Sequence, residues 1–239
     1  MTAVLERVPE TELMLGEEQA DAYAAADLSE LQQRMVTQFT ARFGALDGGR
    51  LLDLGCGAAD MTIRFAAAFT NVTALGVDGS PALLRQGESA VRAAGLDRRV
   101  RLELRHLPDA ELEQGRFDVV IANSLLHHLA DPATLWRTVA RCAKPGAPVL
   151  VMDLRRPDTE DEAERLVASH AAEARPVLRQ DFLNSLHAAY RAGEIRTQLD
   201  DAGLPHFQVE EHGDLHVLVW GRATDRDDSQ APTTTGVTR

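Results

Sequence analysis

The sequence predicts an α/β fold, in which helices cover both faces of a mostly parallel sheet. Two observations carry this prediction: short apolar runs alternate with helical patterns over residues 50–154, and the first run ends in a glycine turn. Strands that alternate with helices through short loops form parallel sheets covered on both faces. At 239 residues and 44% hydrophobic content, the chain can bury one such core.

The elements follow in order along the chain. An amphipathic helix is expected over residues 17–43, because apolar side chains recur there at intervals of three and four. These side chains are Leu28, Leu31, Met35, Phe39 and Phe43. Five apolar runs predict strands at residues 50–54, 72–77, 100–104, 117–122 and 148–153. Helices are predicted between them near residues 60–69, 80–94 and 132–143.

The alternation stops after Asp153. Residues 157–192 are charged and helical without a strand, and a further helix is expected to about residue 202. Two strands near 206–210 and 215–221 are predicted to form an antiparallel hairpin at the edge of the sheet. We therefore expect an N-terminal helical segment over 1–44, an α/β domain over 45–223 with a helical insertion at 157–192, and a disordered polar tail over 224–239.

Composition limits the partners and the compartment. A formal charge of −12 argues against binding to nucleic acid or to anionic membranes. The two cysteines, Cys56 and Cys142, give no disulfide framework, and no apolar segment approaches the roughly 20 residues that span a membrane. We expect a soluble cytoplasmic protein, and a homodimer is left open.

Residues that close neighbouring strands are expected to form one ligand crevice, because ligands bind beyond the carboxyl ends of parallel strands. Asp53 ends the first strand and is followed by Gly55 and Gly57. Asp78 closes the second strand about 20 residues later, where a carboxylate accepts hydrogen bonds from the hydroxyls of a ribose. The alternative for Asp78 is a helix N-cap, but Ser80 suits that role better.

The charge around the glycine turn distinguishes between nucleosides. Dinucleotide sites use an empty helix N-terminus for pyrophosphate, whereas this helix begins with Asp60. A carboxylate there repels phosphate and favours a cationic sulfonium or ammonium group.

Four stretches together carry a family resemblance: LLDLGCGAAD at 51–60, LGVDGSPALL at 75–84, FDVVIANSLLHHLADP at 117–132 and KPGAPVLVMDL at 144–154. In this order and spacing they resemble the class I S-adenosylmethionine-dependent methyltransferases. The resemblance implies a Rossmann-like three-layer α/β/α sandwich with a seven-stranded sheet, S-adenosyl-L-methionine as cofactor and an N-terminal lid. The cofactor contacts expected from it and from the crevice are Tyr23, Asp53, Gly55, Cys56, Gly57, Asp60, Asp78, Gly79, His106, Leu107, Asn123 and Ser124.

Two positions depart from the family pattern. Ala59 stands where a third glycine is common. His106 falls near the place of an acidic residue that often meets the adenine amino group, so that His106 either stacks on adenine or points to solvent.

His127 and His128 are the expected catalytic residues, because histidine is a suitable general base near neutral pH. Neighbours on a helix point about 100° apart, so at most one addresses the substrate well, and His128 is the better candidate for packing. The alternative is that this segment is only the family's common helix start. No metal is expected, because adjacent histidines lack the i, i+4 spacing of a helical pair. Asp153 is expected to contact substrate or to act as a buried cap.

Substrate choice is expected to lie outside the shared core, in the first helix and the insertion. An arginine of the insertion could hold a carboxylate of a small acidic substrate, or these arginines pair with Glu160, Asp161, Glu162 and Glu164 on a solvated face. The insertion and the residues just before it carry a polar set, defined as Arg155, Arg156, Arg179, His187 and Tyr190. The expected substrate contacts are Tyr23, His127, Asp153, Arg155, Arg179 and Tyr190.

The expected function is methyl transfer to a small molecule at N, O, S or an activated carbon, in secondary or specialised metabolism. Two alternatives stay open: S-adenosylmethionine chemistry without methyl transfer, such as intramolecular cyclisation, and a non-catalytic cofactor-binding protein. A nucleic-acid or protein methyltransferase is disfavoured by the acidic balance and by a fourth strand that ends Ala-Asn-Ser-Leu, without the Asn-Pro-Pro-Tyr type of signature.

Overall fold

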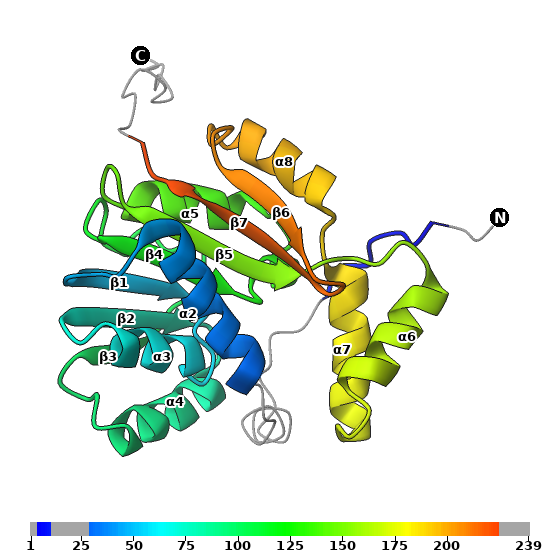
Figure 1. Cartoon of the computed structure of the whole chain (residues 1–239), viewed down its shortest axis with the longest axis horizontal. Coiled ribbons are helices and arrows are strands. Elements are labelled where there is room, and N and C mark those ends of the chain that lie inside the picture. The colour runs from blue at the N-terminus through cyan, green and yellow to red at the C-terminus, as the bar shows by residue number, and fades with distance from the viewer. Residues whose placement is uncertain (1–3, 11–28, 225–239) are drawn as a thin grey trace, which may run out of the picture.

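The computed structural model describes residues 4–10 and 29–224 and contains a seven-stranded sheet between layers of helices (Figure 1). The strands are β1 (Gly49–Leu54), β2 (Val72–Asp78), β3 (Val100–Leu104), β4 (Val119–Asn123), β5 (Pro148–Leu154), β6 (Gln208–His212) and β7 (His216–Arg222). The helices are α2 (Ser29–Phe43), α3 (Asp60–Ala68), α4 (Pro81–Ala93), the short 3-10 helix η1 (Leu126–His128), α5 (Ala133–Cys142), α6 (Glu160–His170), α7 (Pro176–Ala188) and α8 (Ala192–Asp201). The predicted α/β sandwich is confirmed.

The strand order is β3-β2-β1-β4-β5-β7-β6. Strands β1 to β5 run parallel to one another, and β7 runs antiparallel to both β5 and β6. The predicted antiparallel pair is therefore present, but only β6 lies at the edge, since β7 pairs with β5 along its whole length. This explains why residues 216–219 are buried while β6 stays largely exposed.

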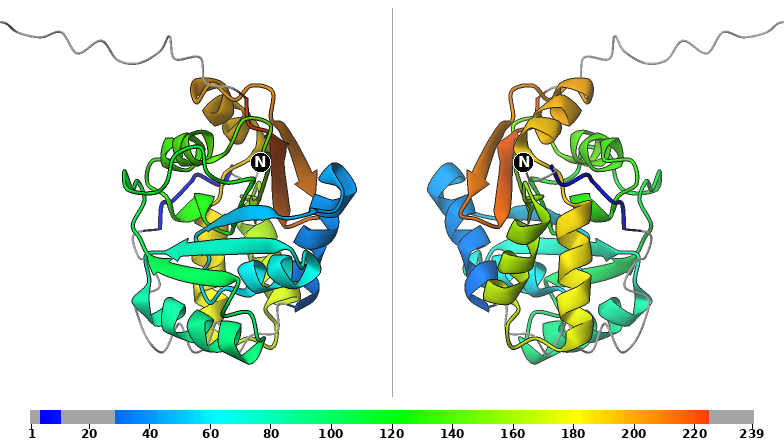
Figure 2. Two further views of the ribbon diagram at one scale, coloured as in Figure 1. Left: turned by 90° about the vertical axis from the view of Figure 1, so that its left-hand side faces the viewer. Right: turned by 90° about the vertical axis from the view of Figure 1, so that its right-hand side faces the viewer.

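Alternating side chains of the central strands serve two cores, because successive residues of a strand point to opposite faces. Leu51 packs with Phe39 of α2 and Phe65 of α3. Its neighbour Leu52 packs with Trp136 of α5 on the other face. Figure 2 shows α2 and α5 on opposite sides of the sheet. Central strands buried on both faces read as continuous apolar runs, which is the pattern that predicted them.

Helix α2 forms part of the core layer. Its side chains Met35 and Phe39 are fully buried, and the ring of Phe39 meets that of Phe65 edge to face at 5.3 Å between centroids. The predicted helix over 17–43 is confirmed in its second half, while residues 11–28, with Leu28 and Tyr23, lie outside the described residues.

The insertion after β5 is a pair of helices, α6 and α7, that stand beside each other with a small core of their own (Figure 1). An extended segment of residues 4–10, here called the N-terminal segment, lies against them. Leu5 N–H donates to Asp158 O at 2.9 Å, and Val8 N–H donates to His187 O at 3.1 Å. Within the described parts of the chain, no helix has both the length and the apolar character needed to cross a membrane.

Candidate functional site

The candidate site lies at the carboxyl ends of β1 and β4, where the strand order reverses. From β1 the chain proceeds to β2 and β3 on one side, and β4 then begins the other side of the sheet. Ligands of open α/β sheets bind at this switch point. The glycine turn after β1 and the η1 helix after β4 both lie at this switch point.

The glycine turn is fixed to the end of β2 by its own N–H groups. Gly55 and Cys56 donate to Val77 O at 2.9 and 3.0 Å, and Gly57 N–H donates to Asp78 Oδ2 at 2.9 Å. These three N–H groups are therefore used within the protein and do not form a phosphate cradle. The geometry agrees with the prediction of a cationic ligand rather than a pyrophosphate.

A separate structural feature accounts for each of the small residues in the glycine turn. A Cβ on Gly55 would lie 2.8 Å from the side chain of Leu125, so a larger residue does not fit. Gly57 has a φ of +52°, and a Cβ there would meet only Leu83, at 3.9 Å. Ala59 has a φ of 68°, which is the left-handed conformation that glycine adopts without strain. The family's third glycine is thus explained by backbone conformation.

Asp78 sits at the end of β2 as predicted and braces the turn. Its Oδ1 accepts from Ser80 N–H at 2.7 Å, and its Oδ2 accepts from Gly57 N–H. Ser80 is the N-cap of α4, with its Oγ accepting from Leu83 N–H at 3.3 Å. The preference for Ser80 over Asp78 as the cap is confirmed. Each carboxylate oxygen can accept a further hydrogen bond from a ligand hydroxyl.

Asp53 is a buried carboxylate beside the turn, with 1% of its surface exposed. Thr62 Oγ1 donates to its Oδ2 at 2.6 Å, while no described group bonds its Oδ1. Burial raises the pKa of Asp53 to about 7, and the nearby charge of Asp78 adds to this rise. Asn123 Oδ1, at the end of β4, is likewise buried without a hydrogen-bond partner among the described residues. Two unpaired acceptor oxygens fit an ammonium ligand.

The remaining expected cofactor residues take varied positions. Asp60 is the first residue of α3, as predicted. Ser124 follows β4 with a φ of 53° and donates its N–H to Met152 O at 2.9 Å. His106 follows β3 and is exposed, so both alternatives for it stay open. Gly79 and Leu107 close β2 and β3 and are partly buried.

Neither cysteine forms a disulfide, and both are buried, which agrees with packing roles. Burial raises the pKa of the Cys56 thiol well above its usual value, and Asp53 and Asp78 raise it further. Cys56 contributes to the turn as a neutral side chain.

His127 and Asp153 form a buried pair on the other side of the site. His127 Nδ1 lies 2.5 Å from Asp153 Oδ1, and both side chains are 2% exposed. Asp153 Oδ2 accepts from Leu126 N–H at 2.7 Å. Burial lowers the pKa of His127, but the charge of Asp153, its hydrogen bond and the charge of Glu10 together outweigh burial, and the net pKa is raised. Burial acts to raise the pKa of Asp153, but the charge and hydrogen bond of His127, with His128 and the Leu126 N–H, together leave it below the usual value.

Both oxygens of Asp153 are thus used within the protein. Of the two roles expected for Asp153, the structure shows the buried cap: its carboxylate accepts from the first N–H of η1 and also orients His127.

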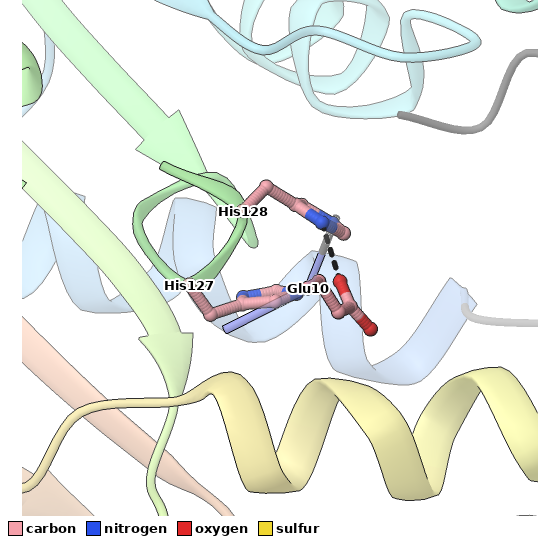
Figure 3. Close-up of side chains that lie close together, drawn as sticks. All are labelled: Glu10, His127 and His128. Atoms are coloured by element: carbon pink, nitrogen blue, oxygen red, sulfur yellow. Dashed lines mark ion pairs between the residues drawn. The ribbon is translucent and has the colours of Figure 1, made fainter. Parts of the chain in front are cut away.

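Glu10 of the N-terminal segment reaches the two histidines (Figure 3). Its Oε2 lies 2.6 Å from His128 Nδ1, and the rings of His127 and His128 are 4.0 Å apart. Ser185 of α7 donates to Glu10 Oε1 at 2.9 Å. Glu10 was not predicted as a site residue, because no local sequence pattern connects residue 10 with residues 127 and 128.

The expected substrate residues of the insertion are dispersed. Arg155 pairs with Glu162 at 3.2 Å, as the alternative of a solvated face predicted. Arg179 is exposed on α7. Tyr190 is 8% exposed and lies under Arg7 of the N-terminal segment, with the guanidinium 4.0 Å from the ring centre. Tyr23 lies outside the described residues. The structure thus brings Tyr190, but neither arginine, toward the segment that carries Glu10.

The other members of the polar set hold the N-terminal segment in place. Arg156 is 2% exposed and donates to Leu5 O and Ala189 O, while its third contact is Glu194. His187 lies 3.2 Å from Glu160. These contacts make them structural residues of the insertion.

Comparisons with known proteins agree with this geometry. Residues 52–149 match a family model described as "Methyltransferase domain". A ubiquinone biosynthesis O-methyltransferase of Bordetella pertussis is 36% identical over 116 residues, which cover 47% of this chain and 46% of that protein. The 27-O-demethylrifamycin SV methyltransferase of Amycolatopsis mediterranei is 27% identical over 206 residues, covering 84% and 71% of the two chains. The chain spans about half the length of the first of these relatives.

A solved structure shares the fold. A SAM-dependent methyltransferase from Aquifex aeolicus has a TM-score of 0.66 at 17% identity, covering 87% of this chain and 99% of that one. The expected resemblance to methyltransferases is thus confirmed over residues 52–149, and the fold agrees with that of a solved SAM-dependent methyltransferase.

Proposed function

We propose that this protein is a class I S-adenosylmethionine-dependent methyltransferase and that it transfers a methyl group to a hydroxyl oxygen of a small-molecule acceptor, in specialised metabolism. The observation that carries the proposal is the placement of two polar groups at the carboxyl ends of β1 and β4. Carboxylates and unpaired acceptor oxygens lie on the cofactor side, and the cluster of Glu10, His127 and His128 lies on the other. The names of the two relatives support oxygen as the acceptor atom.

The cofactor side fits S-adenosylmethionine by charge and shape. Asp78 would bind the ribose hydroxyls through lone pairs that Gly57 and Ser80 leave available. Asp53 Oδ1 and Asn123 Oδ1 would accept from the ammonium of the methionine moiety. The cofactor supplies an electrophilic methyl group on a sulfonium. The protein must therefore align the acceptor oxygen and assist its deprotonation.

The acceptor side is formed by His127, His128 and Glu10. Methyl transfer to a hydroxyl requires that the oxygen lose its proton, and these are the ionisable groups that η1 and the N-terminal segment bring together. Asp153 acts through His127 by fixing its ring. The net charge of −12 supports a small molecule rather than a nucleic acid as the partner.

The reaction type is tested by mass spectrometry of the cosubstrate and of the acceptor. The full chain is incubated with S-adenosylmethionine and a panel of phenols, amines and thiols. We expect S-adenosylhomocysteine, with a phenol or alcohol that gains one CH₂ unit. Release of methylthioadenosine would overturn methyl transfer, and methylation of amines or thiols alone would overturn the assignment to oxygen.

A further inference from the structure

Glu10, His127 and His128 offer ligand atoms that all lie within 4.8 Å of one another (Figure 3). Within residues 4–10 and 29–224, this is the group of histidine, cysteine and carboxylate side chains that comes close enough to hold a metal ion. Two imidazoles and one carboxylate form a donor set that suits Zn²⁺ and other divalent transition metals. A metal was not expected from the sequence, because the spacing of His127 and His128 does not report a ligand as distant in sequence as Glu10.

His127 is oriented as a metal ligand is. Its Nδ1 faces Asp153 Oδ1 at 2.5 Å, and Leu126 N–H holds the other oxygen of Asp153 in place. With Nδ1 bonded to this carboxylate, Nε2 is the ring nitrogen that carries a lone pair for a ligand bond. Metal-binding histidines nearly always have such a carboxylate or carbonyl behind them.

Glu10 and His128 form a close ion pair. Glu10 Oε2 and His128 Nδ1 are 2.6 Å apart, and both atoms are buried. Ser185 donates to the other oxygen of Glu10 and fixes its carboxylate. The carboxylate of Glu10 and the two imidazoles therefore lie close enough together to bind one shared ion.

We infer that Glu10, His127 through Nε2, and His128 bind one divalent transition-metal ion, of which Zn²⁺ is the representative. The ion connects Glu10 of the N-terminal segment to the histidines of η1. Metal binding therefore favours the docking of residues 4–10 onto η1. Three protein ligands leave a further coordination position open.

The occupant of that position rests on the proposed function. A hydroxyl oxygen of the acceptor would bind there, and its proton would be lost more easily because a divalent cation stabilises the alkoxide or phenolate. This would make His127 a metal ligand and not a general base in the transfer.

The metal site is tested on the full chain without cofactor or acceptor. The protein is treated with a chelator, dialysed and titrated with Co²⁺, whose visible absorption reports its coordination, and then with Zn²⁺ by calorimetry. We expect one equivalent to bind, and Zn²⁺ to displace Co²⁺. Absence of stoichiometric binding by the folded protein would overturn the inference.

Two variants and one control locate the ion. We expect Glu10→Gln and His128→Gln each to weaken Zn²⁺ binding by at least about tenfold. The matched control, His170→Gln, removes a surface histidine that lies 3.3 Å from Asp214, and its affinity should equal that of the natural protein. Equal affinities in all four proteins would show adventitious binding elsewhere and reject the site. Circular dichroism verifies that each variant is folded.

The metal site and the methyl-transfer function can be tested independently of each other. S-adenosylmethionine affinity is measured by calorimetry on the metal-free and the Zn²⁺-loaded protein. Loss of metal binding with intact cofactor binding and turnover rejects the metal site alone, whereas stoichiometric metal with no methyl transfer to any acceptor rejects the proposed function alone.

Discussion

Asp78 has a double role at the glycine turn, since it braces Gly57 and Ser80 and keeps lone pairs for a ligand. We expect Asp78→Ala to weaken S-adenosylmethionine binding by about 100-fold, because hydrogen bonds to a charged group contribute about 1.5–3 kcal/mol each. Isothermal calorimetry measures the change. Asp97→Ala, an exposed carboxylate after α4, is the control and should bind like the natural protein. An unchanged affinity in Asp78→Ala would remove the ribose assignment.

Asp53 should make the stability of the protein depend on pH. Its pKa is about 7 in the fold against 3.8 for a free carboxyl, so the folded state keeps a proton that the unfolded chain releases. Stability therefore falls as the pH rises from about 4 to about 7 and is constant above. Asp53→Asn cannot ionise. Relative to the natural protein, we expect the variant to gain about 3 kcal/mol in unfolding free energy between about pH 5 and about pH 8.

Urea denaturation at both pH values measures this difference. Asp97→Asn serves as the control, because an exposed carboxyl has nearly the same environment in both states. A difference between Asp53→Asn and the natural protein that stays constant with pH would contradict the raised pKa.

Single residues were predictable from the sequence where local chemistry determines them. Asp60 at the start of α3 and Ser80 as the cap of α4 follow from their place next to a strand end, and Asp78 closes β2 as expected. Glu10 and Arg7 were not predictable. Their partners lie more than a hundred positions away, and neither hydrophobic periodicity nor capping signals report such contacts.

At the scale of elements, the N-terminal segment depends on Arg7. Arg7 Nε donates to Ala188 O at 2.6 Å, one terminal nitrogen donates to His127 O at 3.3 Å, and the guanidinium covers the ring of Tyr190. Arg7→Met keeps the length of the side chain and removes these interactions. We expect amide exchange at residues 4–10 to become at least about tenfold faster, since each charged hydrogen bond contributes about 1.5–3 kcal/mol.

Hydrogen-exchange mass spectrometry measures this change, and Arg165→Met on the exposed face of α6 is the control. Because the segment carries Glu10 and not the cofactor residues, we expect the KM for the acceptor to rise while S-adenosylmethionine affinity stays within about twofold. Exchange rates equal to those of the control would show that Arg7 does not hold the segment.

Most elements were predictable because their patterns are strong. Buried parallel strands give continuous apolar runs, and α5 and α3 give clear helical periodicity between them. The place of β7 inside the sheet was not predicted, although its apolar run HVLVW contrasts with the polar QVEEH of β6, because neither pattern names β5 as the second pairing partner of β7. The extended path of residues 4–10 has no periodic signal and is determined by α7 and η1.

At the scale of the whole molecule, the protein joins a cofactor half to an acceptor half that is assembled from distant parts. The turn, α3 and α4 stand on the parallel sheet, and the hydrogen bonds of Asp53, Asp78 and Ser80 that brace the turn lie within residues 53–83. The acceptor half combines η1 with α7 and the N-terminal segment. Cofactor identity is therefore readable from one stretch of sequence, whereas acceptor identity depends on contacts across the whole chain.

This division predicts how ligands stabilise the fold. S-adenosylmethionine at about 100 times its Kd should add about 2.7 kcal/mol to the free energy of unfolding, which corresponds to a rise in Tm of about 5–10 °C for a domain of this size. Adenosine monophosphate at the same concentration should give no shift, because Asp60 and Asp78 repel phosphate and the turn's N–H groups are already bonded within the protein. Differential scanning fluorimetry measures both, with Asp78→Ala as the variant that loses the shift. A larger shift with the nucleotide than with S-adenosylmethionine would mean that the crevice selects phosphate and not a cation.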